Sequence, residues 1–86
     1  MARRLVLVTG ASSGIGAAFA RQFAQKGWDL ALVARREDKL KDLAEEVKAQ
    51  FGVDSLIIAE DLSDPGAPGR IVKAIADAGR QIAGLV

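Results

Sequence analysis

Residues 5–16 have the sequence Leu-Val-Leu-Val-Thr-Gly-Ala-Ser-Ser-Gly-Ile-Gly, an apolar run that passes directly into a glycine-rich segment. The run Leu5–Val8 contains no polar residue, which predicts a strand buried on both faces, as the central strands of parallel sheets are. Beyond the glycines, apolar residues recur every four positions as far as about Lys26, and this spacing predicts a helix. We assign the apolar stripe of that helix, Ile15, Phe19 and Phe23, to the core.

The same alternation of buried strand and amphipathic helix continues along the chain. It predicts a second strand from Trp28 to Ala34, a helix from about Glu37 to Phe51, a third strand from Ser55 to Ala59, a third helix with Pro68 in its first turn, and a fourth strand from Ile82 to Val86. The order βαβαβαβ predicts a Rossmann-type α/β fold, a doubly wound parallel sheet with strand order 3-2-1-4. Its topological switch point should follow the first strand.

The composition excludes several classes of protein. Half of the 86 residues are hydrophobic and 27% are charged, which predicts one globular unit, and the absence of cysteine and histidine excludes disulfide frameworks and the commonest metal ligands. Residues 1–36 carry six basic residues and one acidic residue, which gives a net charge of +5. Residues 37–86 carry six basic and ten acidic residues, which gives a net charge of −4. Because aromatic residues do not interleave the basic ones, we expect a small phosphorylated ligand and no nucleic acid.

Neither a membrane span nor a secretory leader is expected. Apolar stretches such as Leu5–Val8 are far shorter than a membrane-spanning helix, and residues 1–4 lead into this stretch without a cleavage site. Together with the lack of cysteine, this predicts a soluble cytoplasmic protein with no membrane partner.

The glycine-rich segment lies at the expected switch point, where sheets of this kind bind ligands. Gly10 permits the tight turn after the strand, Gly14 lets the backbone approach a pyrophosphate, and Gly16 lets the helix pack closely on the sheet. Backbone N–H groups at the helix start, around Ile15, favour the negative charge of a diphosphate. The alternative is a glycine-rich turn without a ligand. A Walker loop is excluded, because no Gly-Lys-Ser or Gly-Lys-Thr ends the segment.

Thr9–Gly16 resembles the Thr-Gly-x-x-x-Gly-x-Gly signature of the short-chain dehydrogenase/reductase family. Residues 32–40 and 61–65 resemble segments of NADP-preferring members, and residues 82–86 resemble the strand that leads into the family's Asn-Asn-Ala-Gly motif. The resemblance covers all 86 residues. It implies that residues 1–86 are the N-terminal, cofactor-binding half of a dinucleotide-binding domain, truncated before that motif and before the family's active-site Ser, Tyr and Lys.

For the full-length enzyme, the resemblance implies hydride transfer between NADP(H) and a small-molecule carbonyl or alcohol substrate. Because the family's catalytic residues are missing from residues 1–86, we expect no catalytic residue, no metal site and no reductase turnover from these residues alone. The substrate cannot be predicted, because its pocket belongs to the other half.

The residues after the second strand indicate which dinucleotide is preferred. An NAD-selective site would place Asp or Glu at the strand end, where this chain has Ala34. Arg35 can bind a 2′-phosphate and stack on adenine, Arg36 adds positive charge, and Ser12 or Ser13 can donate a hydroxyl to the ribose or phosphate. The alternative is a solvated arginine pair ahead of a helix. Because the pair follows the glycine loop, we predict NADP as the cofactor.

Asp61 and Leu62 follow the third strand. The family resemblance implies that the Asp61 carboxylate accepts a hydrogen bond from the adenine amino group and that the Leu62 N–H reaches a ring nitrogen. The alternative is an acidic loop that leads into a helix. Trp28 opens the second strand at the end away from this site, so we assign it to packing.

A second hypothesis is a non-catalytic half-Rossmann module that associates with itself and binds no nucleotide. Under either hypothesis we expect a homo-oligomer, because the fourth strand would leave an open sheet edge and one helix face is poor in apolar residues.

Overall fold

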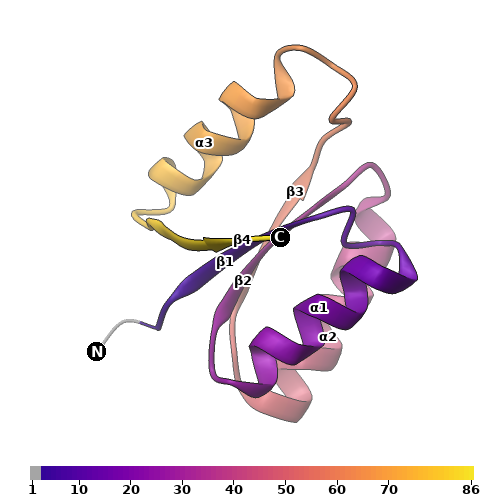
Figure 1. Ribbon diagram of the computed structural model, residues 1–86, viewed down its shortest axis with the longest axis vertical. Helices are drawn as coiled ribbons and strands as arrows, with labels where there is room; N and C mark the ends of the chain where they lie inside the picture. The colour runs from indigo at the N-terminus through magenta and orange to yellow at the C-terminus, as the bar shows by residue number, and fades with distance from the viewer. Residues whose placement is uncertain (1–2) are drawn as a thin grey trace.

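The computed structural model describes residues 3–86, in which four strands alternate with three helices (Figure 1). In chain order these are β1 (Leu5–Thr9), α1 (Gly14–Gln25), β2 (Asp29–Ala34), α2 (Glu37–Phe51), β3 (Ser55–Ala59), α3 (Ala67–Asp77) and β4 (Ile82–Leu85). The element types and their order are those predicted, and the bounds differ only by single residues at the ends. Met1 and Ala2, which entered the argument against a secretory leader, lie outside the described residues.

The strands form one parallel sheet in the order β3-β2-β1-β4, which confirms the predicted topology. β1 lies between β2 and β4, and Leu7 pairs with both Ala31 and Leu85. The register of β1 with β4 shifts between Leu5 and Val6, whereas the pairing of β2 with its two neighbours is regular. Because all the strands are parallel, they end at one edge of the sheet, where the glycine loop follows β1.

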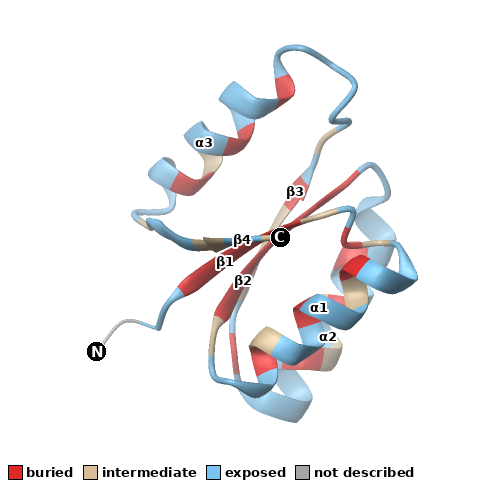
Figure 2. Ribbon diagram, in the orientation of Figure 1, coloured by how far each residue is buried: buried red, intermediate tan, exposed pale blue. Residues whose placement is uncertain are grey.

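Helices cover both faces of the sheet, with α1 and α2 on one face and α3 on the other (Figure 1). Alternate strand residues supply two separate cores, so Val6 and Val8 pack toward α1 and α2 while Leu5 and Leu7 pack toward α3. β2 is buried throughout and β1 over its first four residues (Figure 2). Their continuous apolar sequence follows from this arrangement, because a strand with helices on both faces has no solvent side.

The bounds of α2 and α3 follow from local sequence. α2 has two acidic residues in its first turn and Lys48 in its last, which suits the helix dipole, and it ends at Gly52, whose φ of 71° favours glycine. Pro68 lies in the first turn of α3, where its missing N–H costs no hydrogen bond. The stripe predicted for α2 is buried: Leu40, Leu43 and Val47. No helix within residues 3–86 is long and apolar enough to cross a membrane.

The apolar stripe predicted for α1 is not in the core, so that assignment was wrong. Ile15 is 76% exposed and Phe19 is 42% exposed. The buried face of α1 instead consists of small residues, Gly16, Ala20 and Ala24. Small side chains let α1 pack close to the sheet, and the larger ones on the adjacent stripe point away from it. Phe23 alone of the predicted stripe packs against the core, with its ring edge-on to Trp28 at a centroid distance of 5.2 Å.

Candidate functional site

The glycine loop between β1 and α1 depends on two of its three glycines for its shape. Gly10 has a φ of +62°, which side-chain-bearing residues rarely adopt. A Cβ added to Gly16 would lie 2.2 Å from the Gly10 carbonyl oxygen, so only glycine permits this approach of helix to loop. A Cβ added to Gly14 would meet no atom within 4 Å. Gly14 is therefore not required by packing within the chain, and the space beside it is accessible to a ligand.

Ser13 caps α1 and holds the loop. Its Oγ accepts a hydrogen bond from the Gly16 N–H at 3.2 Å and donates one to the Gly10 carbonyl oxygen at 2.8 Å. Within residues 3–86, the N–H groups of Gly14 and Ile15 donate to no acceptor. Unbonded N–H groups at a helix start, reinforced by the helix dipole, form a site for an anion.

A groove of about 450 Å³ runs along this edge of the sheet from the glycine loop across the ends of β2 and β3. Its lining brings together five of the sequence-predicted site residues: Gly10, Ser12, Arg35, Asp61 and Leu62. The other lining residues are Val33, Ala34, Glu60 and Ser63. Ser13, Gly14, Ile15 and Gly16 lie in the loop and first turn of α1, next to Ser12, and Arg36 lies outside the lining.

The two consecutive arginines have different surroundings. Arg36 precedes the first turn of α2 without a side-chain capping hydrogen bond and pairs with Asp38 at 3.3 Å, and this hydrogen-bonded contact holds the pKa of the Asp38 carboxyl below its usual value. Arg35 lines the groove beside Ala34 and has no ion pair within residues 3–86. The groove therefore contains one arginine without an ion pair in the described chain, next to a strand end without a carboxylate.

The Asp61 carboxylate faces the groove from a preformed turn. Its Oδ1 accepts hydrogen bonds from the N–H of Ser63 at 2.9 Å and from the Ser63 hydroxyl at 2.7 Å. These contacts, with a further contribution from the positive charge of Arg35, hold the Asp61 pKa below its usual value. Asp61 is therefore ionised at neutral pH and accepts hydrogen bonds only.

A second network in the same loop was not found by sequence reasoning. Arg70, on α3, donates from Nε to both Glu60 oxygens at 2.9 and 3.0 Å and from Nη2 to Asp64 Oδ2 at 2.8 Å. These carboxylates raise the pKa of Arg70 above its usual value. The position of Glu60, directly after the apolar strand β3, was a signal for Glu60 alone, and no spacing rule links Glu60 to Arg70.

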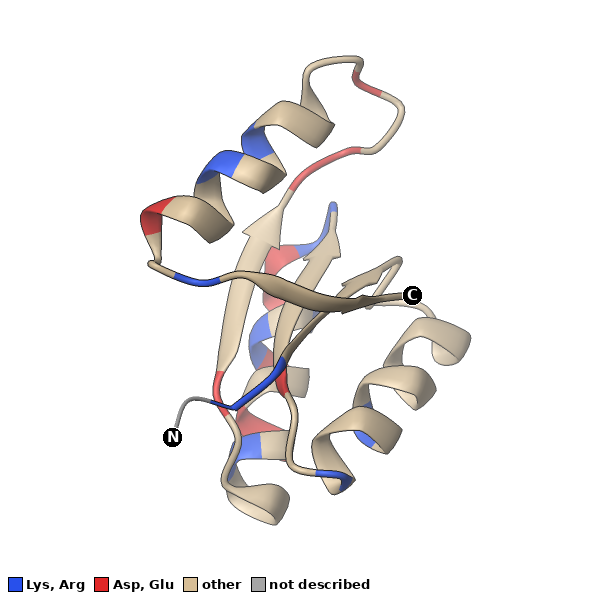
Figure 3. Cartoon of the chain, turned by 60° about the vertical axis from the view of Figure 1, so that its left-hand side comes forward, with Lys and Arg blue, Asp and Glu red and all other residues tan. Residues whose placement is uncertain are grey.

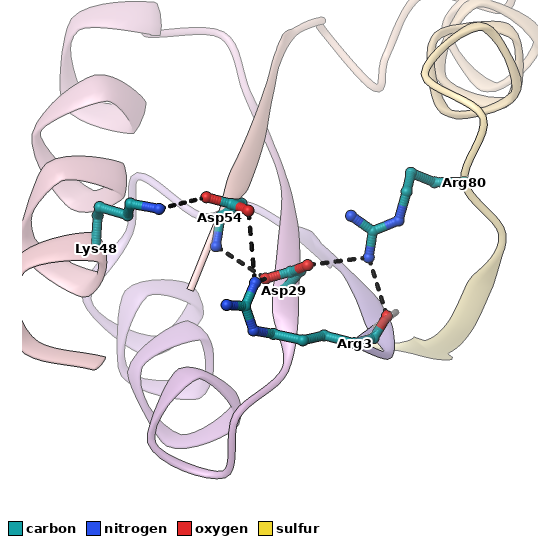
Figure 4. Close-up of polar contacts among 5 residues, drawn as sticks. All are labelled: Arg3, Asp29, Lys48, Asp54 and Arg80. Atoms are coloured by element: carbon teal, nitrogen blue, oxygen red, sulfur yellow. Dashed lines mark hydrogen bonds and ion pairs between the residues drawn. The ribbon is translucent and has the colours of Figure 1, made fainter. Parts of the chain in front are cut away.

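The opposite edge of the sheet holds a cluster of charged residues that precede or open the strands, which we call the Asp29 cluster (Figures 3 and 4). Asp29 is buried at 3% exposure, and its two oxygens pair with Arg3 at 3.2 Å and Arg80 at 3.1 Å. Asp29 Oδ1 also accepts the Asp54 N–H at 2.8 Å, and Lys48 pairs with the Asp54 carboxylate at 2.7 Å. The one sequence signal was a charge at the start of an otherwise apolar strand.

A second hollow, of about 390 Å³, lies between α2 and the start of β3. It is lined by Ala44, Glu45, Lys48, Ala49, Val53, Asp54 and Ser55, none of which was predicted as a site residue. Of these two hollows, the groove at the glycine loop is the stronger candidate, because it contains an arginine without an ion pair in the described chain and hydrogen-bonding side chains, and the start of α1 lies next to it.

Comparison with known proteins identifies relatives across nearly the whole chain. The sequence profile described as short chain dehydrogenase matches residues 4–86. Sulfoacetaldehyde reductase 2 of Chromohalobacter salexigens is 40% identical over 82 residues, which is 95% of this chain and 32% of the relative. The chain thus spans about a third of the length of this curated relative.

Solved structures show the same arrangement. L-Sorbose reductase of Gluconobacter frateurii, described as complexed with NADPH and L-sorbose, superposes with a TM-score of 0.91 at 34% identity, covering 99% of this chain and 32% of that one. An alcohol dehydrogenase of Thermococcus sibiricus, described as complexed with 5-hydroxy-NADP, superposes with a TM-score of 0.91 at 31% identity. The match covers 98% of this chain and 36% of that one.

Proposed function

The chain belongs to the short chain dehydrogenase family, and from this membership we propose that residues 1–86 form the N-terminal, NADP(H)-binding half of the dinucleotide-binding domain of an oxidoreductase. The observation that carries the proposal is the position of Arg35. It lines the groove next to Ala34, without an ion pair within residues 3–86, at the position where a carboxylate would repel a 2′-phosphate. Two structural neighbours described with NADPH or an NADP analogue support the same cofactor.

Each part of the groove suits one part of the cofactor. The unbonded N–H groups of Gly14 and Ile15, beside Ser12, suit the pyrophosphate, and the side of Gly14 has the room that this group needs. Arg35 suits the 2′-phosphate, with Arg36 next to it contributing positive charge that Asp38 partly offsets. Asp61 and the Leu62 N–H suit adenine, because an ionised carboxylate accepts from an amino group and a backbone amide donates to a ring nitrogen.

We further propose that the whole protein moves hydride between NADP(H) and a carbonyl or alcohol substrate. The bound nicotinamide supplies or accepts the hydride, which is the chemistry of this cofactor and not of the polypeptide. The 86 residues contain no histidine, cysteine or tyrosine, and we assign no catalytic residue within them. Their part is to bind and orient the dinucleotide.

Calorimetric titration of the 86-residue chain with NADPH and NADH tests the proposal. We expect saturable binding of one NADPH per chain and weaker binding of NADH, whereas binding of neither contradicts it. Fluorescence of Trp28 is a poor probe, because Trp28 lies beside Arg4 and Phe23, away from the groove. Arg35→Gln should weaken the preference for NADPH over NADH, because it removes the proposed partner of the 2′-phosphate. Arg36→Gln is the matched control, since it removes the neighbouring charge outside the groove.

A second candidate function, self-association, is favoured by the edge strand β4. Ile82 and Leu85 are 41% and 70% exposed, and residues 81–86 carry no charge and no proline. The other edge strand, β3, has Asp54 and Glu60 directly before and after it, and charges of this kind protect sheet edges against pairing. We propose that copies of the chain associate through β4. Sedimentation over a range of concentrations tests this independently of nucleotide.

A further inference from the structure

The loop after β3 places an unusual amount of negative charge beside a groove that we propose binds a polyanion. Glu60, Asp61 and Asp64 lie within five residues, and the first two line the groove. Figure 3 shows acidic segments along the loop that follows β3. A dinucleotide carries several phosphate charges, so uncompensated carboxylates at this edge would weaken its binding. Asp61 has an assigned partner in the ligand, whereas Glu60 and Asp64 have none.

Arg70 contacts both of these carboxylates and does not line the groove itself. Its Nη2 lies 2.8 Å from Glu60 Oε1 and 2.8 Å from Asp64 Oδ2, and its Nε donates to both Glu60 oxygens. The Glu60 side chain is only 19% exposed, so this pair is better shielded from water than the Arg70–Asp64 pair of the same loop, in which the Asp64 side chain is 51% exposed. The Arg70 guanidinium thus links Glu60, at the start of the loop, to Asp64, further along it.

The contacts continue from Arg70 to the residues that face the groove. Asp64 Oδ1 accepts the N–H of Gly66 at 2.9 Å, and the Asp64 N–H donates to the Asp61 carbonyl oxygen at 3.0 Å. Asp64 is therefore bonded on one side to Arg70 and on the other to the turn that contains Asp61 and Leu62. A Cβ on Gly66 would lie 2.7 Å from Arg70 Nη1, so the guanidinium packs directly over the backbone at the start of α3.

We propose that Arg70 is a positioning residue for the adenosine half of the dinucleotide. It neutralises Glu60 and Asp64 and holds the loop so that Asp61 and Leu62 face the groove, without touching the ligand. This role rests on the proposed cofactor-binding function and adds a determinant on α3, outside the glycine loop and the end of β2.

The test uses adenosine 2′,5′-bisphosphate as the probe, with NADPH alongside, in calorimetric titrations of the 86-residue chain. Arg70→Gln should raise the Kd for both ligands by about three- to tenfold, the size expected for a partly shielded charge near a bound phosphate. Lys73→Gln is the matched control, because the Lys73 side chain is 76% exposed on the same helix and its one ion pair within residues 3–86 is with Asp77 at 3.8 Å. It should change Kd by less than about twofold.

A rescue variant separates the positioning role from a general loss of stability. Glu60→Gln combined with Arg70→Gln removes the Glu60 carboxylate that Arg70→Gln leaves uncompensated, so it should recover part of the lost affinity while the contact of Arg70 with Asp64 stays lost. Failure of this double variant to recover any affinity, or an equal effect of Arg70→Gln and Lys73→Gln, overturns the role of Arg70.

The folded state of each variant is checked by its melting temperature. Where Arg70→Gln does not fold, Glu60→Gln alone carries the test: unchanged or tighter binding supports the proposal, and weaker binding overturns it because Glu60 would then contact the ligand itself. Absence of binding by the unaltered chain contradicts the proposed function, whereas binding that Arg70→Gln leaves unchanged overturns only the inference about Arg70.

Discussion

The two edges of the sheet differ in whether some of their polar groups stay unbonded within the described chain. At the edge where the strands begin, the buried Asp29 carboxylate has Arg3, Arg80 and the Asp54 N–H as partners within the chain. At the edge where the strands end, Arg35 and the first N–H groups of α1 have no partner within residues 3–86. Polar groups that a fold leaves unbonded in a groove are those available to a ligand, while those it pairs internally stabilise the fold.

This contrast implies that substitutions at the two edges have separable effects. Changes in the Asp29 cluster should lower the free energy of unfolding and leave nucleotide affinity of the folded chain unchanged. Changes to groove residues should lower nucleotide affinity and leave the free energy of unfolding unchanged. A residue of the glycine loop that also sets the loop shape is an exception.

Gly16 is that exception and should give the largest effect. Gly16→Ala places a Cβ 2.2 Å from the Gly10 carbonyl oxygen, so the loop and α1 must separate. We expect a loss of at least about 3 kcal/mol in the free energy of unfolding, measured by urea denaturation.

Gly14 provides the matched control within the same loop. Gly14→Ala should change the free energy of unfolding by less than about 1 kcal/mol, because its Cβ meets no atom. The larger Gly14→Val should leave the chain folded and abolish NADPH binding. Equal destabilisation by Gly14→Ala and Gly16→Ala would contradict the division of tasks between the two glycines.

Asp29→Ala should give the next largest loss of stability. It leaves Arg3, Arg80 and the Asp54 N–H without their common acceptor, and we expect a cost of about 2–4 kcal/mol, reduced from that of a fully buried pair because both arginines are partly exposed. Asp54→Asn, which removes an exposed charge of the same cluster, should cost less. Urea denaturation measures the free energy of unfolding of both variants. An Asp29→Ala chain as stable as the unaltered one would show that the Asp29 cluster does not stabilise this edge.

At the groove, the combined change Ala34→Asp and Arg35→Gln should convert the cofactor preference. A repulsive carboxylate replaces a cation, and we expect the NADPH-to-NADH preference to fall by about 1–3 kcal/mol, or about five- to 150-fold in the ratio of Kd values. Arg36→Gln should change that ratio little, because Arg36 pairs with Asp38. The two nucleotides are compared by calorimetry, and an unchanged ratio in the double variant rules out contact of Arg35 with the 2′-phosphate.

Disruption of self-association should give the smallest effect. It involves the outermost strand β4, and neither the end of the sheet where the strands begin nor the end where they finish. Leu85→Lys adds a charge to the exposed side of β4 and should shift the chain toward monomer without altering its melting temperature or NADPH affinity. Analytical ultracentrifugation at several concentrations measures the shift. A chain that is monomeric before substitution, even at high concentration, contradicts association through β4.

The fold could be predicted from sequence because its determinants are local. Buried runs such as Leu5–Val8, the period of α2 and helix-ending glycines each specify an element, and the strict alternation of elements favours a doubly wound parallel sheet. The glycine loop, Ala34 and Arg35 could be located for the same reason, since parallel strands bring their ends to one edge.

Contacts between residues distant in sequence could not be predicted. Asp29 is separated from Arg3 by 26 positions, and Arg70 from Glu60 by 10, and no periodicity links either pair. The assignment of the apolar stripe on α1 to the core was wrong for a related reason. Phe19 and Ala20 lie on adjacent faces of the helix, and the packing distance between helix and sheet decides which of them is buried.

The central claim is that the edge at the glycine loop binds NADP(H) while the Asp29 edge serves stability. Amide chemical shifts of the 15N-labelled chain during titration with NADPH test it residue by residue. We predict that the shifts concentrate at Gly10 to Ile15, at Arg35 and at Asp61 and Leu62, and that Asp29 and Arg80 are unaffected. Shifts centred on the Asp29 cluster or on the hollow between α2 and β3, or no shifts at saturating NADPH, would contradict it.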